Sequence, residues 1–441
     1  MDEKHQHNVF GKKPIDYILE PINRFLAVES AGGIVLLSAA AVALILANSS
    51  LSDAYFAFWK TKVGFSFGSF SFIHSLQHWV SDGLMAIFFF TVGLEVKREL
   101  VIGELSDFNR AILPVAAAVG GMLFPAIFYL YFQAGEAGEA GWGIPMATDI
   151  AFVVGILAVL GSRVPQILRV FLLSLAIVDD IGAILVIAIA YTEQIFFVPL
   201  FTAFGALLIM FLLQKLGARS FAVYTLLGII VWFGFHESGV HATIAGVILG
   251  LMTPTKSLVN KGVFTNILSR VQATLHGEKW DTAKHRGTKI RNFQRLSREV
   301  VSPLEYLEDA LHPWSSFVIM PVFALANAGV VINISLFSHP ISLSIMIGLV
   351  AGKVIGIVLL TWLAVRFFTK KLPEGLSWPV VTGGGFLGGI GFTMAMFIAG
   401  LALDSALLDP AKIGIIGGSL VAAILGVGIL LFSLKNPESL S

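Results

Sequence analysis

Long apolar stretches, separated by short polar connections, recur along most of the chain. A helix needs about 20 apolar residues to cross the hydrocarbon core of a bilayer, so we expect these stretches to be transmembrane helices. Two of them, at 144–161 and 380–403, are interrupted by Gly or Pro. Twelve spans are predicted, at residues 26–48, 79–97, 111–133, 144–161, 167–192, 196–214, 220–236, 239–253, 313–333, 340–367, 380–403 and 411–433.

The composition supports a polytopic membrane protein. Together with the apolar stretches, it leads us to expect an all-α fold with one small β-hairpin, which is described below. Of 441 residues, 56% are hydrophobic and only 13% are charged, whereas soluble domains carry about 25% charged residues. The absence of cysteine excludes disulfides and thiolate chemistry. The first 24 residues are polar without a signal-peptide pattern, and the first span is therefore expected to be an uncleaved anchor. We expect the lipid bilayer, and no nucleic acid, as a partner.

Basic residues predict the orientation of the spans. With the N-terminus in the cytoplasm, all 29 Lys and Arg residues except Lys60, Lys62, Lys353 and Lys412 fall on the cytoplasmic side, as the positive-inside rule requires. The predicted organisation is a cytoplasmic segment at 1–25, eight spans within 26–253, a cytoplasmic loop at 254–312, four spans within 313–433 and a cytoplasmic tail at 434–441.

Residues 62–75 differ from the rest of the chain because phenylalanines alternate with small residues around Gly68–Ser69. Alternation with a period of two around such a pair predicts a β-hairpin, here on the outer face. An isolated hairpin is marginally stable in water, so it needs a surface to pack on. A second copy of the chain and the chain's own loops are both possible partners.

Three carboxylates lie in spans that run back to back: Asp149 in one, Asp179 and Asp180 in the next. A charged side chain at the centre of a bilayer costs about 2.5–3.5 kcal/mol or more, and such residues usually mark ion or proton pathways. For Asp149 alone, a structural role as a helix cap or ion-pair partner is an equal alternative. Adjacent acids repel unless a proton or cation lies between them, which favours a transport role for Asp179 and Asp180.

Two further features point to the same region. Lys353 lies at mid-span, too deep to reach water easily, so its partner is expected among the three acids. Six glycines within residues 383–391 are poor helix formers, and irregular backbone at membrane depth is tolerated only within protein or beside a water-filled cavity. Pro145, shortly before Thr148 and Asp149, suggests a second interruption.

The interrupted spans occupy matching positions in the two halves. Spans three to five start inside and spans ten to twelve start outside, and the middle span of each triplet is the interrupted one. This is the pattern of an inverted-topology repeat with an ion site where two discontinuous helices cross. The helix ends carry partial charges; we expect Asp149 to offset the positive N-termini and Lys353 the carbonyl ends.

From about residue 23 to 433 the chain resembles the NhaA-type sodium/proton antiporter family. The motifs that carry the resemblance are SDGLMAIFFFTVGLEVKREL at 81–100, GIPMATDIAF at 143–152, SLAIVDDIGAI at 174–184, SGVHATIAGVILG at 238–250, LHPWSSFVIMPVFALANAGV at 311–330 and GIGFTMAMFI at 389–398. The resemblance implies that Asp180 binds the cation, that Asp179 gates or pairs, and that Lys353 bridges to Asp179. It implies that Thr148 and Asp149 assist in the interrupted fourth helix.

The resemblance also implies residues for a pH response. Glu95 and Glu99 match a cytoplasmic cluster with Lys97 and Arg98, Glu308 and His312 match as well, and Asp82 matches an acid of lesser effect beside the site. The chain departs from the family at Glu305, Tyr306, Asp309 and Val354, which puts the pH-response profile in question. His241 is either a pH-sensing residue or a histidine satisfied at the membrane interface. The hairpin matches the family's dimer contact.

The expected function is exchange of cytoplasmic Na⁺ or Li⁺ for external protons, electrogenic and regulated by pH, in the bacterial inner membrane. No enzyme chemistry and no cofactor are expected, because the ions are the cargo. Two other classes remain as alternatives. An intramembrane aspartyl protease would place its acids on separate spans, and a passive cation channel is opposed by the deep Lys353.

Overall fold

The computed structural model describes residues 29–68, 70–192, 194–217, 221–256 and 301–434. The predicted N-terminal segment 1–25 lies outside the described residues. So do most of the predicted loop 254–312 and nearly all of the predicted tail 434–441. The chain divides into two compact units, which we describe separately.

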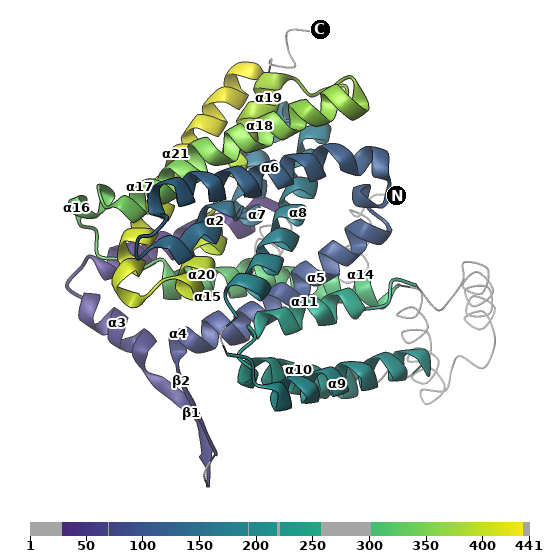
Figure 1. Ribbon diagram of the computed structural model, residues 1–441, viewed down its shortest axis with the longest axis vertical. Helices are drawn as coiled ribbons and strands as arrows, with labels where there is room; N and C mark the ends of the chain where they lie inside the picture. Colours follow the sequence, from purple (N-terminus) through teal and green to yellow (C-terminus); the bar gives the residue numbers. More distant parts are fainter. Residues whose placement is uncertain (1–28, 69, 193, 218–220, 257–300, 435–441) are drawn as a thin grey trace, which may run out of the picture. The chain divides into compact units, whose positions relative to one another are not determined.

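The first unit comprises Met1–Leu84, Phe108–Tyr191 and Ser316–Ser441, and most of its described residues are helical (Figure 1). Its main helices and strands are α2 (Glu29–Ala47), α3 (Ser52–Lys60), β1 (Lys62–Phe67), β2 (Phe70–Ser75), α4 (Leu76–His78), α6 (Phe108–Gln133), α7 (Ile150–Leu160), α8 (Gln166–Ala190), α15 (Met320–Asn327), α16 (Ile334–Phe337), α17 (Pro340–Ile347), α18 (Lys353–Ala364), α19 (Trp378–Gly388), α20 (Phe392–Ala402) and α21 (Ser405–Ser433). Its 3₁₀ segments are η4 (Glu139–Met146) and η5 (Gly161–Arg163), and its π-helical segments are η2 (Trp79–Leu84), η8 (Gly348–Gly352) and η9 (Val365–Thr369).

The second unit comprises Met85–Asp107 and Thr192–Ser315. Its described elements are α5 (Met85–Val101), the 3₁₀ turn η3 (Glu104–Ser106), α9 (Phe197–Lys215), α10 (Phe221–Glu237), α11 (Thr243–Met252) and α14 (Pro303–Trp314). The π-helical turn η7 (Ser315–Ile319) begins where this unit ends. Glycine allows α5 and α11 to pack closely. A Cβ atom added at Gly246 would lie only 2.1 Å from the carbonyl oxygen of Ala86, which leaves no room for a side chain there.

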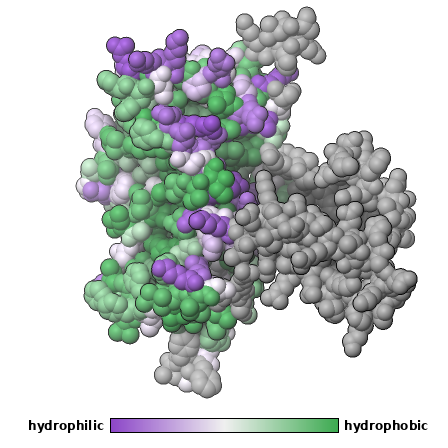
Figure 2. All heavy atoms as spheres, turned by 90° about the vertical axis from the view of Figure 1, so that its right-hand side faces the viewer, coloured by the Kyte–Doolittle hydropathy of each residue, from purple (hydrophilic) through white to green (hydrophobic). Residues whose placement is uncertain are grey.

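The helices confirm a multi-pass architecture at a coarser level than the sequence predicts. Among the described residues, seven helices are long and apolar enough to cross a bilayer, and nine spans result if each of two bent helix pairs counts as one. Two predicted spans correspond to shorter apolar helices, Phe221–Glu237 and Thr243–Met252. Many large apolar side chains are exposed, among them Val159 at 77% and Ile189 at 80%, and Figure 2 shows hydrophobic residues over much of the visible surface. Such a surface suits a lipid environment.

The predicted hairpin is confirmed. Strands β1 and β2 pair antiparallel, with Phe65 opposite Phe72 and Lys62 opposite Ser75, and the hairpin extends away from the neighbouring helices (Figure 1). Gly68 adopts a φ of 60° in the turn, a conformation that glycine reaches without steric cost. One unpredicted element precedes it: α3, which turns away from α2 at 114°.

Helices α6 and α18 pack closely against each other in the first unit. A Cβ atom added at Gly356 would lie 2.0 Å from the carbonyl oxygen of Gly120, and one added at Gly120 would lie 2.1 Å from that of Gly356. Small residues permit such backbone approach between membrane helices. The contact fixes α18, and with it Lys353 at its first turn, against α6.

Candidate ion site

Two interrupted helices define the site. Segment η4 ends at Met146, three non-helical residues follow, and α7 begins at Ile150. Similarly, α19 ends at Gly388 and α20 begins at Phe392, with an angle of 46° between them. Pro145 accounts for the first interruption because it lacks a backbone N–H. Gly389 and Gly391 lie in the second interruption, where glycine, a poor helix former, suits the break. The other four glycines of the run lie within α19, so the irregular backbone is shorter than the sequence predicts.

The two interruptions are bonded directly to each other. The backbone N–H of Asp149 donates to the carbonyl of Ile390 at 2.7 Å, and the Thr148 hydroxyl lies 2.8 Å from the carbonyl oxygen of Gly388. A Cβ atom added at Gly391 would lie 3.0 Å from the carbonyl oxygen of Ala147. The glycines therefore serve two purposes: they end the helix, and they let the two backbones meet.

Asp149 accepts hydrogen bonds at the N-termini of two half-helices. One carboxylate oxygen accepts from the Phe152 N–H at 3.4 Å, which makes Asp149 the N-cap of α7. The other accepts from the Thr393 N–H at 3.0 Å, in the first turn of α20, and from the Thr393 hydroxyl. Helix N-termini carry partial positive charge, so a carboxylate with 0% exposure is stabilised here.

Lys353 forms an ion pair with Asp179, and both side chains are 0% exposed. The ammonium Nζ lies 2.6 Å from a carboxylate oxygen of Asp179 and also donates to the carbonyl of Met146, at the end of η4. Removing two charges from water costs several kcal/mol each, and mutual attraction offsets this only with good geometry and further hydrogen bonds. The freed carbonyl of the interrupted helix supplies one of those bonds.

Thr148 connects the ion pair to the second interruption. Its hydroxyl oxygen lies 2.7 Å from Asp179 Oδ2 and 2.8 Å from the Gly388 carbonyl oxygen. A hydroxyl has one hydrogen to donate, so at any moment it donates to one of these acceptors. Among the described residues, Asp179 Oδ1 is buried without a hydrogen-bond partner. The lone pairs of this oxygen atom of Asp179 are therefore available to a cation or a proton.

Asp180 follows Asp179 on α8 and is only 2% exposed. Consecutive residues of an α-helix point about 100° apart, so Asp180 presents its carboxylate in a different direction from the ion-paired Asp179. The structure thus brings Thr148, Asp149, Asp179 and Lys353 together around the two interruptions and keeps Asp180 beside them. Sequence reasoning missed the Met146, Gly388 and Ile390 carbonyls, because a backbone group has no signature in the sequence.

The residues expected to respond to pH lie in the second unit. Asp82, which the resemblance gives as an acid of lesser effect beside the site, is on η2 of the first unit. Arg98 on α5 forms an ion pair with Glu308 on α14, with side-chain exposures of 44% and 9%. Burial raises the pKa of the Glu308 carboxyl above its ordinary value, and the Arg98 guanidinium opposes the rise.

The other pH-response candidates lie on α5, on α14 and in the segment before α11. Glu95 is half-buried on α5, and Glu99 accepts from the Glu104 N–H at 2.9 Å. His312 lies on α14, whereas His241 lies before α11 with its Nδ1 atom 3.2 Å from the Thr243 hydroxyl.

Glu305, one of the departures from the family pattern, has a structural explanation. The Ser302 hydroxyl accepts from the Glu305 N–H at 3.2 Å, and the Glu305 carboxylate accepts from the Ser302 N–H at 3.1 Å. This reciprocal capping box stabilises the start of α14. Because Glu305 and Glu308 lie on the same helix, the capping box at Glu305 helps to hold Glu308 against Arg98.

Comparison with known proteins gives a consistent result across the chain. The sequence profile of the family described as Na⁺/H⁺ antiporter 1 matches residues 23–430. The Na⁺/H⁺ antiporter NhaA of Rhodopirellula baltica is 53% identical over 425 residues, which cover 96% of this chain and 97% of the relative. That of Rhizobium meliloti is 48% identical over 417 residues, covering 94% and 95%. Antiporter NhaA 1 of Acidiphilium cryptum is 46% identical over 441 residues, covering 100% and 98%.

The buried ion pair predicts a specific pattern of stability. Lys353→Met and Asp179→Asn each leave one partner buried alone, whereas the double substitution removes both charges. We expect the free energy of unfolding of each single variant to fall by about 3–5 kcal/mol, the cost of breaking a buried ion pair. The free energy of unfolding of the double variant should fall by less than the sum of these two losses. Thermal unfolding of purified protein in detergent measures this, with the exposed Lys60→Met as control. Additive losses in the double variant would contradict the pair.

Proposed function

The chain belongs to the Na⁺/H⁺ antiporter 1 family, and we propose that it exchanges cytoplasmic Na⁺ or Li⁺ for external protons through the site around Asp179 and Asp180. Because this family consists of antiporters, the chain is a transporter rather than an enzyme. The family assignment therefore excludes the alternative of an intramembrane aspartyl protease. The observation that carries the site is the buried cluster of Asp179, Lys353 and Thr148 where two interrupted helices meet.

The cluster offers the ligands that a Na⁺ ion requires. Carboxylates, a hydroxyl and backbone carbonyls freed by broken helices coordinate Na⁺ in transporters of this type. Asp180 binds the cation in this proposal, and Asp179 and Thr148 complete the site from α8 and the fourth-span interruption. Asp149 supports it from the helix N-termini, where its carboxylate is already satisfied by Thr393 and Phe152.

Exchange follows from competition between a cation and protons for the same carboxylates. A carboxylate that holds a proton has no charge left to balance Na⁺, so the two ions exclude each other at the site. Na⁺ binds when the cytoplasm is alkaline and leaves when protons arrive from outside. Protonation of Asp179 releases Lys353, which adds a second charge to the cycle and makes exchange electrogenic. A passive channel would not couple the two fluxes in this way.

The finer architecture is also a proposal: twelve spans with both termini in the cytoplasm, arranged as an inverted repeat of spans three to five and ten to twelve. Its support is that the first members of the two triplets, α6 and α18, approach closely at Gly120 and Gly356. The middle members are the two interrupted helices, bonded through Asp149 and Ile390. The domain organisation given above follows this scheme, with the protein in the bacterial inner membrane.

We assign pH regulation to the pair of Arg98 and Glu308, with Glu95, Glu99, His241 and His312 as further candidates. Because its pKa is raised by burial, Glu308 takes up a proton at a higher pH than an ordinary glutamate. Below that pH the carboxyl is neutral and its attraction to Arg98 weakens; above it the ion pair forms. The charged pair is the form expected in the alkaline, active state.

The hairpin is proposed as a contact between two copies of the chain. One part of it packs on its own unit, because Phe72 is 5% exposed and its ring contacts Trp79 edge-on at 5.3 Å. The other part stays open: Phe65 is 59% exposed and Val63 is 47% exposed. An apolar strand surface of this kind favours pairing with a second hairpin.

Asp180→Asn should abolish exchange, because the amide neither carries the charge that balances Na⁺ nor titrates in its place. Proton flux in everted vesicles from a host without its own antiporters, with Na⁺, Li⁺ or K⁺ added, measures this. Wild-type protein should respond to Na⁺ and Li⁺ but not K⁺, and the variant to none. Full exchange by an inserted Asp180→Asn protein would overturn the site assignment.

Glu308→Gln should shift the pH profile of exchange to higher pH by about one unit, the scale that one charge partner sets, because the amide cannot form the charged pair. Asp309→Asn on the same helix is the matched control. The Asp309 charge raises the pKa of Glu308, so its removal should move the profile slightly the other way. Identical profiles in all three proteins would exclude Glu308 from the pH response.

The absence of cysteine allows a direct test of the dimer. Phe65→Cys should form a disulfide-linked dimer on mild oxidation in membranes, because equivalent residues meet across a two-fold axis. Tyr131→Cys, at a position that is even more accessible with 82% exposure, should remain monomeric on a denaturing gel. Equal cross-linking of both variants would indicate random collision instead of a hairpin contact.

A further inference from the structure

Segment η4 leads from the surface of the first unit to the ion site, and it is weak as a helix. Its first residues, Glu139 and Ala140, are exposed, whereas residues 143–146 are buried. Runs of 3₁₀ helix longer than about three or four residues are uncommon, because their hydrogen-bond geometry is poor. Pro145 removes one further backbone N–H. A segment of eight residues built in this way needs support from its surroundings.

Two tyrosine hydroxyls supply this support by bonding to the backbone of η4. Tyr129 on α6, which is 0% exposed, donates its hydroxyl to the Gly138 carbonyl at 2.6 Å, where η4 begins. Tyr191 is the C-cap of α8. Its hydroxyl accepts from the Gly143 N–H at 3.2 Å and donates to the Ala140 carbonyl at 2.9 Å. The segment is thus held at its start and in its middle.

The sequence of η4 is adapted to these two hydroxyls. A Cβ atom added at Gly141 would lie 2.5 Å from the hydroxyl oxygen of Tyr129, and one added at Gly143 would lie 2.7 Å from that of Tyr191. A side chain at either position would therefore displace the hydroxyl. Neither glycine has a positive φ, so the backbone conformation does not require them. Contact with the tyrosines explains both.

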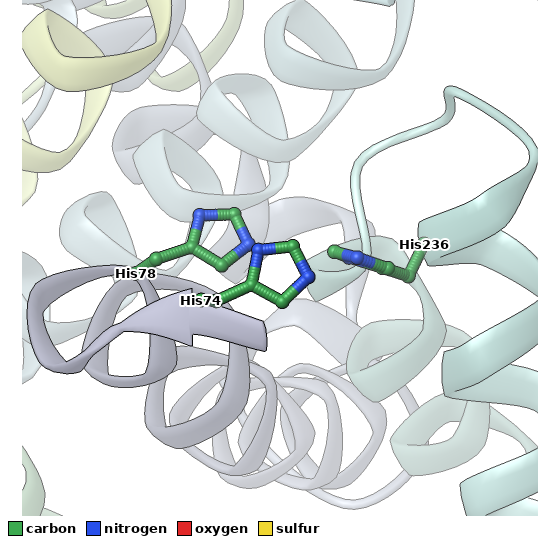
Figure 3. Close-up of side chains that lie close together, drawn as sticks. All are labelled: His74, His78 and His236. Carbon is green, nitrogen blue, oxygen red and sulfur yellow. The ribbon is translucent and has the colours of Figure 1, made fainter. Parts of the chain in front are cut away.

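A hydroxyl bonded to a peptide group fixes a different part of the chain from a stacked ring. At the base of the hairpin, the rings of His74 and His78 stack with centroids 4.3 Å apart (Figure 3). Such a contact fixes one side chain against another. Tyr129 and Tyr191 instead bond to main-chain groups, so they determine where the backbone of η4 lies.

The far end of η4 contributes directly to the ion site. Met146 ends the segment, one 3₁₀ turn after Gly143, and its carbonyl accepts from the Lys353 ammonium. Shortly after it, the Thr148 hydroxyl lies 2.7 Å from Asp179 Oδ2. A displacement of η4 would therefore move both the carbonyl that holds the lysine and the hydroxyl that contacts the acid.

Tyr191 also connects η4 to the helix that carries the acids. Its backbone N–H donates to the Ile187 carbonyl at 3.3 Å, at the end of α8. Asp179 and Asp180 lie on this same helix. The Tyr191 side chain therefore joins the helix of the two carboxylates to the segment that supplies their neighbouring carbonyl and hydroxyl.

We propose that Tyr191 and Tyr129 are positioning residues for the transported cation. They hold η4, and η4 in turn places the Met146 carbonyl against Lys353 and Thr148 against Asp179. This inference rests on the cation site proposed above. Because the acids themselves are unchanged when a tyrosine hydroxyl is lost, that loss should weaken cation binding and not slow the turnover of an occupied site.

Tyr191→Phe tests the inference, because it removes only the hydroxyl. It should raise the KM for Na⁺ about three- to tenfold, the scale of one or two lost hydrogen bonds, and leave the maximal rate within about twofold of wild type. Proton flux in everted vesicles over a range of Na⁺ concentrations, normalised to inserted protein, measures both. Tyr129→Phe should act in the same direction. Tyr55→Phe is the matched control, because its hydroxyl donates to the Leu325 carbonyl at 2.6 Å, on α3 of the same unit, and its KM should be unchanged.

A second variant displaces the same hydroxyl from the opposite side of the contact. Gly143→Ala introduces a Cβ atom against the Tyr191 hydroxyl, so it should also raise the KM. Combined with Tyr191→Phe it should raise the KM no further, because both changes remove one contact and contacts shared in this way are not additive. Gly428→Ala is the control, since a Cβ atom there meets nothing within 4 Å.

Three outcomes would overturn the inference while leaving the proposed exchange in place. The first is an unchanged KM in Tyr191→Phe. The second is a lower maximal rate with an unchanged KM, which indicates only a loss of folded protein. The third is a double variant in which the two increases in KM multiply. A wild-type chain without Na⁺-dependent proton flux would instead overturn the proposed function, and this inference with it.

Discussion

The cost of burying charge is the constraint on which the site depends. Lys353 and Asp179 are both fully buried, and an ion pair in such a place is stable only when further hydrogen bonds surround it. The interior of an intact helix has no free carbonyl to offer, because its backbone groups bond one another, and only the helix ends leave carbonyls without partners. The interruption after Met146 frees the carbonyl that accepts from Lys353. The broken helix is thus the structural counterpart of the buried charge.

The same reasoning applies to the opposite charge. The interruptions leave unsatisfied N–H groups at the starts of α7 and α20, and the Asp149 carboxylate accepts from both. Each irregularity in the backbone is therefore matched by a side chain of the right sign. The Thr148 hydroxyl contacts both Asp179 and the Gly388 carbonyl. A change of charge at Asp179 therefore changes which of these two acceptors receives the hydroxyl hydrogen, and so alters the hydrogen bonding at the second interruption. A site of this construction is suited to couple ion occupancy to helix position.

Other charged groups of the chain are more exposed. The ion pair of Arg98 and Glu308 keeps 44% of its guanidinium side chain accessible, and the histidines at the base of the hairpin are also partly accessible. Partly solvated groups exchange protons and ligands with bulk water at low cost, whereas fully buried ones do so only when the structure moves. This difference in exposure distinguishes groups that exchange protons with solution from the buried groups to which the proposed mechanism assigns the transported ion.

The sequence by itself determined much of this arrangement. The lengths of the apolar stretches, the alternation at 62–75, Pro145 and the glycine run are local signals, and they specify membrane helices, a hairpin and two interruptions. Local signals cannot specify contacts between distant residues. The residues alone left three acids as partners for Lys353; the resemblance pointed to Asp179, and the tertiary structure places the carboxylate of Asp179 2.6 Å from the lysine Nζ, across 174 residues. The tertiary structure alone identified the carbonyls of Met146, Gly388 and Ile390 as hydrogen-bond partners at the site, because every residue carries a carbonyl. It alone also gave the 114° turn into α3, because packing rather than composition decides where a short helix points.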